Sequence, residues 1–108
     1  MKTNYEFGKV IDLNGQIEAD DAKVVSHVIF ETSNGGVLLL ALIAGQKLDK
    51  HLAPAELMVN VLEGEIEFTM DENVHSMRKG EFILVGADVP HSVVAKSDAK
   101  LMLVRIKN

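Results

Sequence analysis

Short runs of apolar and β-branched residues, separated by turn residues at intervals of roughly ten positions, limit the fold of this chain more than any other feature. Seven or eight such runs occur in the 108 residues, and almost none of the sequence has helical periodicity. Residues 65–70 alternate cleanly, with Ile66, Phe68 and Met70 on one face. This spacing predicts an all-β sandwich or barrel.

Two runs stand out in the first half of the chain. Residues 24–30 are rich in β-branched side chains and lead into a turn at 32–36. Residues 37–44 form a continuous apolar run, which is the pattern of a strand covered on both faces. The polar residues 46–50 are interpreted as a connection that leads to His51.

The remaining segments are interpreted from their turn residues. Residues 57–62 and 65–70 flank a tight Glu63-Gly64 turn, and we predict that they form a hairpin. The first two dozen residues are polar and rich in turn formers. We expect a loop there, with at most one short strand near residues 5–11.

Composition limits the chemistry that is available to the chain. Cysteine is absent, which excludes disulfide scaffolds, thiolate metal sites and cysteine nucleophiles. Any metal must therefore be held by nitrogen and oxygen donors. The nitrogen can come only from the four histidines, His27, His51, His75 and His91.

Charge and hydropathy exclude further classes of partner. The chain has 16 acidic and 11 basic residues and a net charge of −5, so nucleic acid is not an expected partner. The longest apolar run, residues 37–44, is far shorter than the roughly 20 residues of a bilayer span. The first ten residues also lack the apolar stretch of a signal peptide. We expect no membrane partner and a cytoplasmic protein.

Two segments, residues 45–64 and 80–95, together resemble the two sequence motifs of the cupin family. The residues at matching offsets are Gly45, His51, Glu63 and Gly64 in the first motif, and Gly80 and His91, preceded by Pro90, in the second. The resemblance implies one cupin-like domain over residues 1–108, folded as a small RmlC-like jelly-roll barrel, or double-stranded β-helix. It also implies that the histidines point into the barrel and hold a divalent metal.

Departures from the family pattern affect this implied metal site most. Ala53 stands where the second histidine belongs, and Leu57 stands where the glutamate belongs under the shortest spacing. Only two of the four implied ligands remain, His51 and His91. Glu56 would supply a third ligand if Pro54 shifted the strand register by one residue, because such a shift exchanges the two faces of a strand. The second motif departs from the pattern at three positions, Gly86, Asp88 and Ala95.

Two functional hypotheses remain. In the first, the chain is a cupin-like protein with a degenerate metal site that binds a small molecule in an apolar barrel pocket. Its pocket residues would be His51, His91, Met58 and Asn60, although a surface position for Asn60 fits equally well. In the second, the chain is a metal-dependent dioxygenase, isomerase or lyase whose iron, manganese, nickel or zinc is held by His51, His91 and Glu56. No complete acid and base set is visible, so catalytic residues stay unassigned.

The two remaining histidines lie outside the motif segments, and the apolar strands bear on the oligomeric state. His27 alternates with apolar neighbours and is interpreted as a hydrogen-bonded or interface residue, whereas His75 is expected to face solvent. Residues 24–30 and 37–44 offer more apolar face than one small barrel interior needs. We therefore expect a homodimer.

Overall fold

All residues from 1 to 108 are described by the computed structural model of the chain, which confirms the all-β class. One short 3-10 turn, η1 (Asn14–Gln16), precedes the strands, and no helix is long and apolar enough to cross a membrane. The strands are β1 (Val25–Thr32), β2 (Gly35–Leu42), β3 (Lys47–His51), β4 (Glu56–Glu63), β5 (Glu65–Met70), β6 (Asn73–Arg78), β7 (Phe82–Val85), β8 (His91–Ala95) and β9 (Ala99–Ile106).

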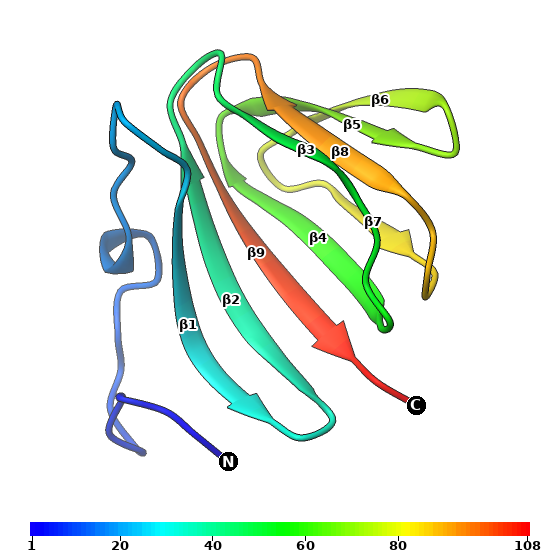
Figure 1. Cartoon of the computed structure of the whole chain (residues 1–108). Helices are drawn as coiled ribbons and strands as arrows, with labels where there is room; N and C mark the ends of the chain where they lie inside the picture. The colour runs from blue at the N-terminus through cyan, green and yellow to red at the C-terminus, as the bar shows by residue number, and fades with distance from the viewer.

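The strands form two antiparallel sheets (Figure 1). The five-stranded sheet has the order β1-β2-β9-β4-β7, and the four-stranded sheet has the order β3-β8-β5-β6. The chain crosses from one sheet to the other after β2, β3, β4, β6, β7 and β8, so most neighbours in space are distant in sequence. This is the jelly-roll arrangement that the sequence predicts.

The core lies between the two sheets and is built by alternation along each strand. On β5, Ile66 and Phe68 are fully buried, whereas Glu65 is exposed on the other face. Thirteen buried residues from both sheets form one continuous cluster. Removing that apolar surface from water is the main term that holds the sheets together.

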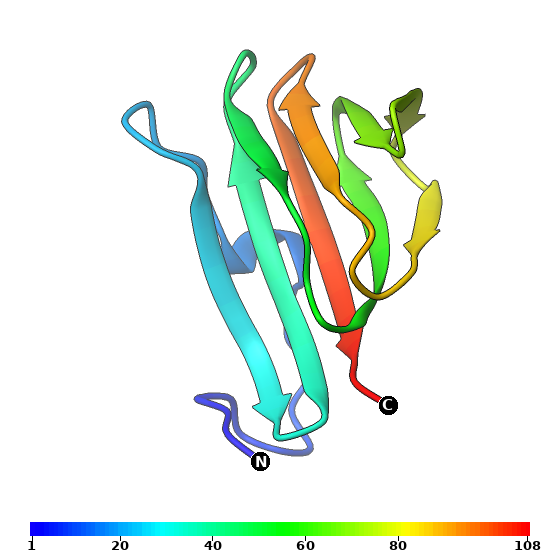
Figure 2. The ribbon, with the colours of Figure 1, turned by 45° about the vertical axis from the view of Figure 1, so that its right-hand side comes forward.

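Strand β2 is covered on both faces, as its continuous apolar run predicts. Leu40 joins the core between the sheets, whereas Leu39 and Ala41 pack against Ile17 from the N-terminal segment. Figure 2 shows that segment, residues 1–24, passing along the outer face of the five-stranded sheet. The chain therefore covers much of the second apolar face of β2 itself.

One local prediction, that for residues 46–50, is wrong. The residues interpreted as a polar connection form β3, an edge strand paired only with β8, in which Leu48 alone is half-buried. An edge strand with little buried surface needs few apolar side chains, so its sequence resembles a loop. The N-terminal segment is a loop with no strand over residues 5–11, in agreement with its polar, turn-rich sequence, and a bridge between Lys2 and Glu31 connects it to β1.

The Glu63-Gly64 turn is a corner between sheets, and the predicted hairpin is wrong. β4 pairs with β7 and β9, whereas β5 pairs with β6 and β8, so the two strands that flank the turn do not pair with each other. Gly64 has a φ of 79°, and a Cβ atom at this position would lie 2.1 Å from the carbonyl oxygen of Asp98. The corner thus requires glycine both for its backbone conformation and for close contact with the chain before β9.

Candidate functional site

His51 and His91 face each other across neighbouring strands. His51 ends β3, His91 begins β8, and the two residues are directly opposite in the strand pairing. Their ring centroids are 4.3 Å apart, with an angle of 61° between the ring planes. Strand pairing therefore brings together two imidazoles that are 40 residues apart in the sequence.

Both imidazoles are oriented by the backbone in the same way. Nδ1 of His51 lies 2.9 Å from the carbonyl oxygen of Asp49, and Nδ1 of His91 lies 2.9 Å from that of Val89. A carbonyl oxygen can only accept a hydrogen bond, so each Nδ1 carries the proton and donates it. In the neutral rings Nε2 is then left with a free lone pair, which can accept a hydrogen bond from a ligand.

His91 is the buried member of the pair. Its side chain stacks on Phe68 with a centroid distance of 5.7 Å and an interplanar angle of 17°, and only 4% of its surface is exposed. Burial lowers the pKa of His91 below 6.5, the hydrogen bond to Val89 opposes this shift, and the neighbouring His51 lowers the pKa further. His91 is therefore a neutral imidazole at neutral pH.

The two histidines lie on the wall of an apolar cavity of about 270 Å³ between the sheets. Ten of its 13 lining residues are hydrophobic. The lining residues come from strands of both sheets and from the loop after β3: Leu38, Leu40, Leu48, His51, Ala53, Leu57, Val59, Phe68, His91, Val93, Leu101, Leu103 and Arg105. An apolar cavity with a few convergent polar groups is the usual form of a small-molecule site.

Arg105 is the cavity residue that the sequence interpretation missed. On β9 the inward positions alternate, and Arg105 continues the row formed by Leu101 and Leu103. That alternation is visible in the sequence, and counting every second residue from Leu101 along the strand at 99–106 would have placed the arginine on the inner face. Apart from the two histidines, Arg105 is the only polar residue in the cavity lining.

Three residues predicted for the site do not line the cavity. Glu56, Met58 and Asn60 share the opposite face of β4 from Leu57 and Val59. Asn60 donates a hydrogen bond of 3.1 Å to the carbonyl oxygen of Met102. Met58 is half-buried on that outer face.

Glu56 is not brought to the two histidines, which corrects its predicted role as a metal ligand. Its carboxylate accepts a hydrogen bond from Asn108. β4 pairs with β9 from Glu56 onward without a shift until Val61, so Pro54 does not exchange the faces of the strand. Side-chain direction on a strand is set by register alone, and this register points Glu56 outward.

The remaining histidines lie away from the cavity. Nε2 of His27 is 2.6 Å from the Tyr5 hydroxyl, which donates in turn to Oε1 of Gln16 over 3.0 Å. His27 is therefore the hydrogen-bonded residue that its pattern indicates. His75, expected to face solvent, is half-buried on β6.

The divalent metal that the cupin resemblance implies does not fit this set of residues. No group of three or more His, Asp or Glu side chains converges to hold a metal ion. Ala53 lines the cavity near His51 and offers only a methyl group, while Arg105 adds a positive charge to the same lining. Two nitrogen donors beside a cation fall short of the three protein ligands that such sites usually need.

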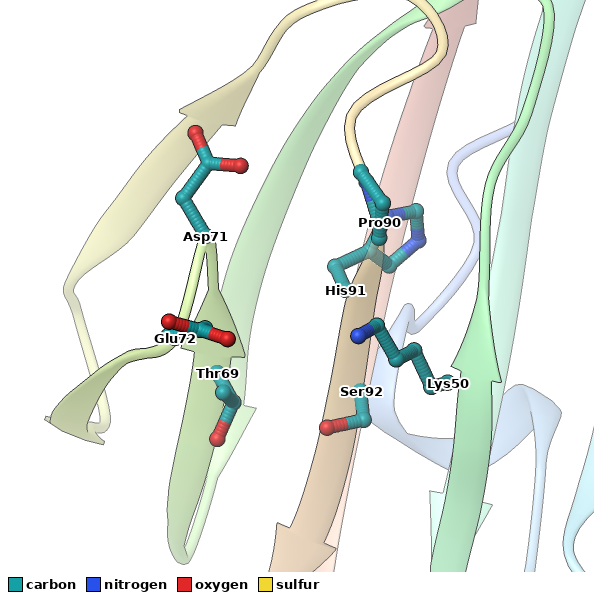
Figure 3. A pocket seen from close by; sticks show the side chains of 7 residues that line it. All are labelled: Lys50, Thr69, Asp71, Glu72, Pro90, His91 and Ser92. Atoms are coloured by element: carbon teal, nitrogen blue, oxygen red, sulfur yellow. The ribbon is translucent and has the colours of Figure 1, made fainter.

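A second, polar hollow of about 350 Å³ lies beside His91 (Figure 3). Figure 3 shows Lys50 and Ser92 on neighbouring strands, with Asp71 and Glu72 on the β5–β6 turn across from them. None of its seven lining residues is hydrophobic, so it offers a ligand no hydrophobic side chain to pack against. The apolar cavity is the better candidate, because a small organic ligand can bury its hydrocarbon surface against ten hydrophobic residues there.

Comparison with solved structures finds the same architecture in other bacterial proteins. A conserved protein of unknown function from Streptococcus pyogenes is 27% identical, with a TM-score of 0.90 over 100% of this chain and 96% of that one. An RmlC-like cupin from Desulfovibrio desulfuricans is 30% identical, with a TM-score of 0.81 over 91% and 95% of the two chains. A cupin superfamily protein from Desulfitobacterium hafniense shares the fold at 18% identity, with a TM-score of 0.89 over 98% and 97%.

The sequence itself was also compared with family models and with curated proteins. No curated protein matches the chain. The model of the cupin domain matches residues 38–107, which include every cavity residue and both motif segments. With that match spanning most of the two-sheet barrel, the chain belongs to the cupin family.

Proposed function

We propose that this cupin binds a small organic molecule in the apolar cavity between its sheets, and that it acts as a sensor or carrier. The observation that carries the proposal is the pair of imidazoles on the cavity wall, whose rings are 4.3 Å apart and whose Nδ1 atoms are both bound to the backbone. This arrangement leaves two hydrogen-bond acceptors on residues of a cavity wall that is mostly hydrophobic.

The proposed binding mode assigns different tasks to the two kinds of side chain. The apolar lining supplies affinity, because a ligand that enters the cavity removes its own hydrocarbon surface from water. His51 and His91 supply orientation, since a hydroxyl or amine group of the ligand can donate to a free Nε2. The backbone hydrogen bonds hold both rings in place before the ligand arrives, which lowers the entropic cost of binding.

Heptan-1-ol is a suitable first probe because it is uncharged, mostly apolar and carries one hydroxyl donor. We expect it to bind the native protein, with chemical-shift changes in amide spectra that are confined to the cavity residues. Ala53→Phe fills the cavity and should weaken binding about tenfold or more. Leu52→Phe is the matched control, because Leu52 is the exposed neighbour of Ala53 and does not line the cavity.

Two results would contradict this proposal. One is the failure of heptan-1-ol to bind, or binding that Ala53→Phe leaves unchanged. The other is tight, stoichiometric binding of zinc, iron, manganese or nickel that is lost in the His51→Ala, His91→Ala double variant. That result would favour the metal-dependent enzyme instead, and isothermal titration with each metal salt measures it directly.

A further inference from the structure

We propose that the ligand of this cavity is an apolar monocarboxylate, and that Arg105 is the residue that binds its carboxylate. This inference rests on the proposed function of the cavity and adds the chemical class of the ligand. The observation that carries it is an arginine on the cavity lining whose Nε atom is buried and has no hydrogen-bond partner.

Arg105 lacks a counter-charge within the chain. The three ion pairs of the structure all use lysine, and no hydrogen bond from the Arg105 side chain is present. Its Nε is the only buried side-chain nitrogen or oxygen atom that lacks a partner. A buried donor with no acceptor is costly, and more so when it belongs to a charged group. A ligand that accepts from this atom would remove the cost.

The chemistry of guanidinium favours a carboxylate as that ligand group. Arginine stays protonated at all ordinary pH values and presents its N–H groups in a planar fork. Nε and one terminal nitrogen of this fork can donate two parallel hydrogen bonds to the two oxygens of one carboxylate. Such a pair would satisfy the unpartnered Nε and neutralise the charge in one step.

The other lining residues favour a ligand with one negative charge and a hydrocarbon remainder. His91 is neutral because burial lowers its pKa, so Arg105 is the one permanent charge of the lining. A phosphate dianion would need more donors than one arginine provides. The cavity volume of about 270 Å³ and its ten hydrophobic residues suit a short aliphatic or aromatic chain.

No other charged side chain of the chain offers Arg105 a partner in the cavity. Apart from Arg105 and the two histidines the lining residues are hydrophobic, and no carboxylate lies on the cavity wall. Arg105 is held beside the β1–β2 turn by its pairing with Gly36 on one side and with Leu57 on the other. Strand pairing on both sides therefore fixes the backbone from which the Arg105 side chain reaches the cavity.

Three probes of equal chain length test this inference: heptanoate, heptan-1-ol and heptylamine. A charge-assisted, bidentate pair with Arg105 should make heptanoate bind native protein about 10- to 100-fold more tightly than heptan-1-ol. Heptylamine should bind more weakly than heptan-1-ol because Arg105 repels its charge. Isothermal titration gives the three dissociation constants on the same protein sample.

Variants of Arg105 assign the preference to this side chain. Arg105→Gln should reduce the affinity ratio of heptanoate to heptan-1-ol to about one, whereas Arg105→Lys should keep part of the advantage of heptanoate. Arg78→Gln is the matched control, since Arg78 is exposed on β6, away from the cavity. Amide spectra of each variant establish that it is folded before its affinities are compared.

The outcomes separate this inference from the proposed function. If heptan-1-ol binds but heptanoate binds no more tightly, or if Arg105→Gln weakens both probes equally, the carboxylate assignment is overturned and the binding function stands. If neither probe binds the native protein, both proposals fail. A preference for heptanoate that Arg105→Gln abolishes and Arg78→Gln preserves supports the assignment.

Discussion

At the scale of single residues, the cavity holds two kinds of polar group that respond differently to burial. His91 avoids a buried charge by remaining neutral, with its one donor bound to Val89 and its pKa lowered by burial. Arg105 cannot lose its proton, so its charge persists in the same lining. The one N–H donor of His91 therefore has an acceptor within the chain, whereas the buried Nε donor of Arg105 has none.

The neutral state of His91 predicts a pH dependence of stability. Because its native pKa is lower than 6.5, the unfolded chain takes up the proton first as the pH falls, and the free energy of unfolding decreases. The decrease begins near pH 6.5 and ends once the pH passes the lowered native pKa. Above pH 6.5 the residue is neutral in both states and contributes no slope.

Urea denaturation of the native chain and of His91→Gln, at pH values from about 7.5 to about 5, measures this contribution. We expect the native chain to lose more stability over this range than His91→Gln does. His75→Gln is the control, because His75 lies outside the cavity on β6 and should keep the native slope. Identical slopes for the native chain and His91→Gln would contradict the assignment of a buried neutral imidazole.

At the scale of elements, the loop before β8 has a left-handed residue at a position where the cupin motif has glycine. Asp88 stands where the second motif has glycine, and it adopts a φ of 62°, a left-handed conformation that aspartate tolerates better than most residues. Its N–H donates to the carbonyl oxygen of Ala53 over 2.8 Å, which ties together the loops that precede β4 and β8. This hydrogen bond therefore connects the two loops that flank the histidine pair.

Two motif glycines allow a matched test of the corner between the sheets. Gly45 and Gly64 both have positive φ, but a Cβ atom at Gly45 would meet nothing within 4 Å, whereas at Gly64 it would overlap the backbone of Asp98. Gly45→Ala should cost about 1 kcal/mol for its backbone conformation alone. Gly64→Ala should cost that amount and about 1–3 kcal/mol more for the overlap.

The difference between the two variants is measured by urea denaturation at neutral pH. Equal losses of stability would show that the corner relaxes to admit a methyl group, contrary to this prediction. Each variant serves as a control for the other, because both substitutions add one methyl group to a glycine of similar φ. The difference in stability then reports the overlap with Asp98 alone.

At the scale of the whole molecule, the exposed apolar surface lies on β4, β7 and β9, whereas the sequence indicates it on the strands at 24–30 and 37–44. The N-terminal segment covers much of the outer face of β2, so this surplus apolar face is not wholly available to a partner. An apolar patch remains on the outer face of β4, β7 and β9, around a hollow of about 350 Å³. Its members are Met58, Phe82, Leu84, Val104 and Ile106, of which Phe82, Leu84 and Ile106 are more than half exposed.

The homodimer therefore stays a prediction, and we assign its interface to this patch. Contiguous exposed apolar surface of this kind marks interaction sites, and a two-fold axis would let the patch cover its own copy. We expect sedimentation velocity at micromolar concentration to give a dimer for the native chain and a monomer for Leu84→Glu. Val74→Glu should remain a dimer, because Val74 is 61% exposed on β6 of the other sheet. A monomeric native chain would refute the prediction.

The sequence by itself determines the class of fold and the two faces of most strands. Period-two alternation is a local property, and it correctly indicates β5 with Phe68 inward and β2 with both faces covered. Motif spacing likewise singles out His51 and His91, because their offsets from glycines at turns are local distances along the chain.

Only the tertiary structure decides which strands pair and which side chains meet. Alternation looks the same on both sides of a hairpin and of a corner, so the partner of β4 is not readable near Gly64. The same limit applies to the site, since the register of β4 turns Glu56 outward while β9 delivers Arg105 from the far end of the sequence. Local periodicity sets the face of a residue, whereas long-range pairing between sheets sets its neighbours.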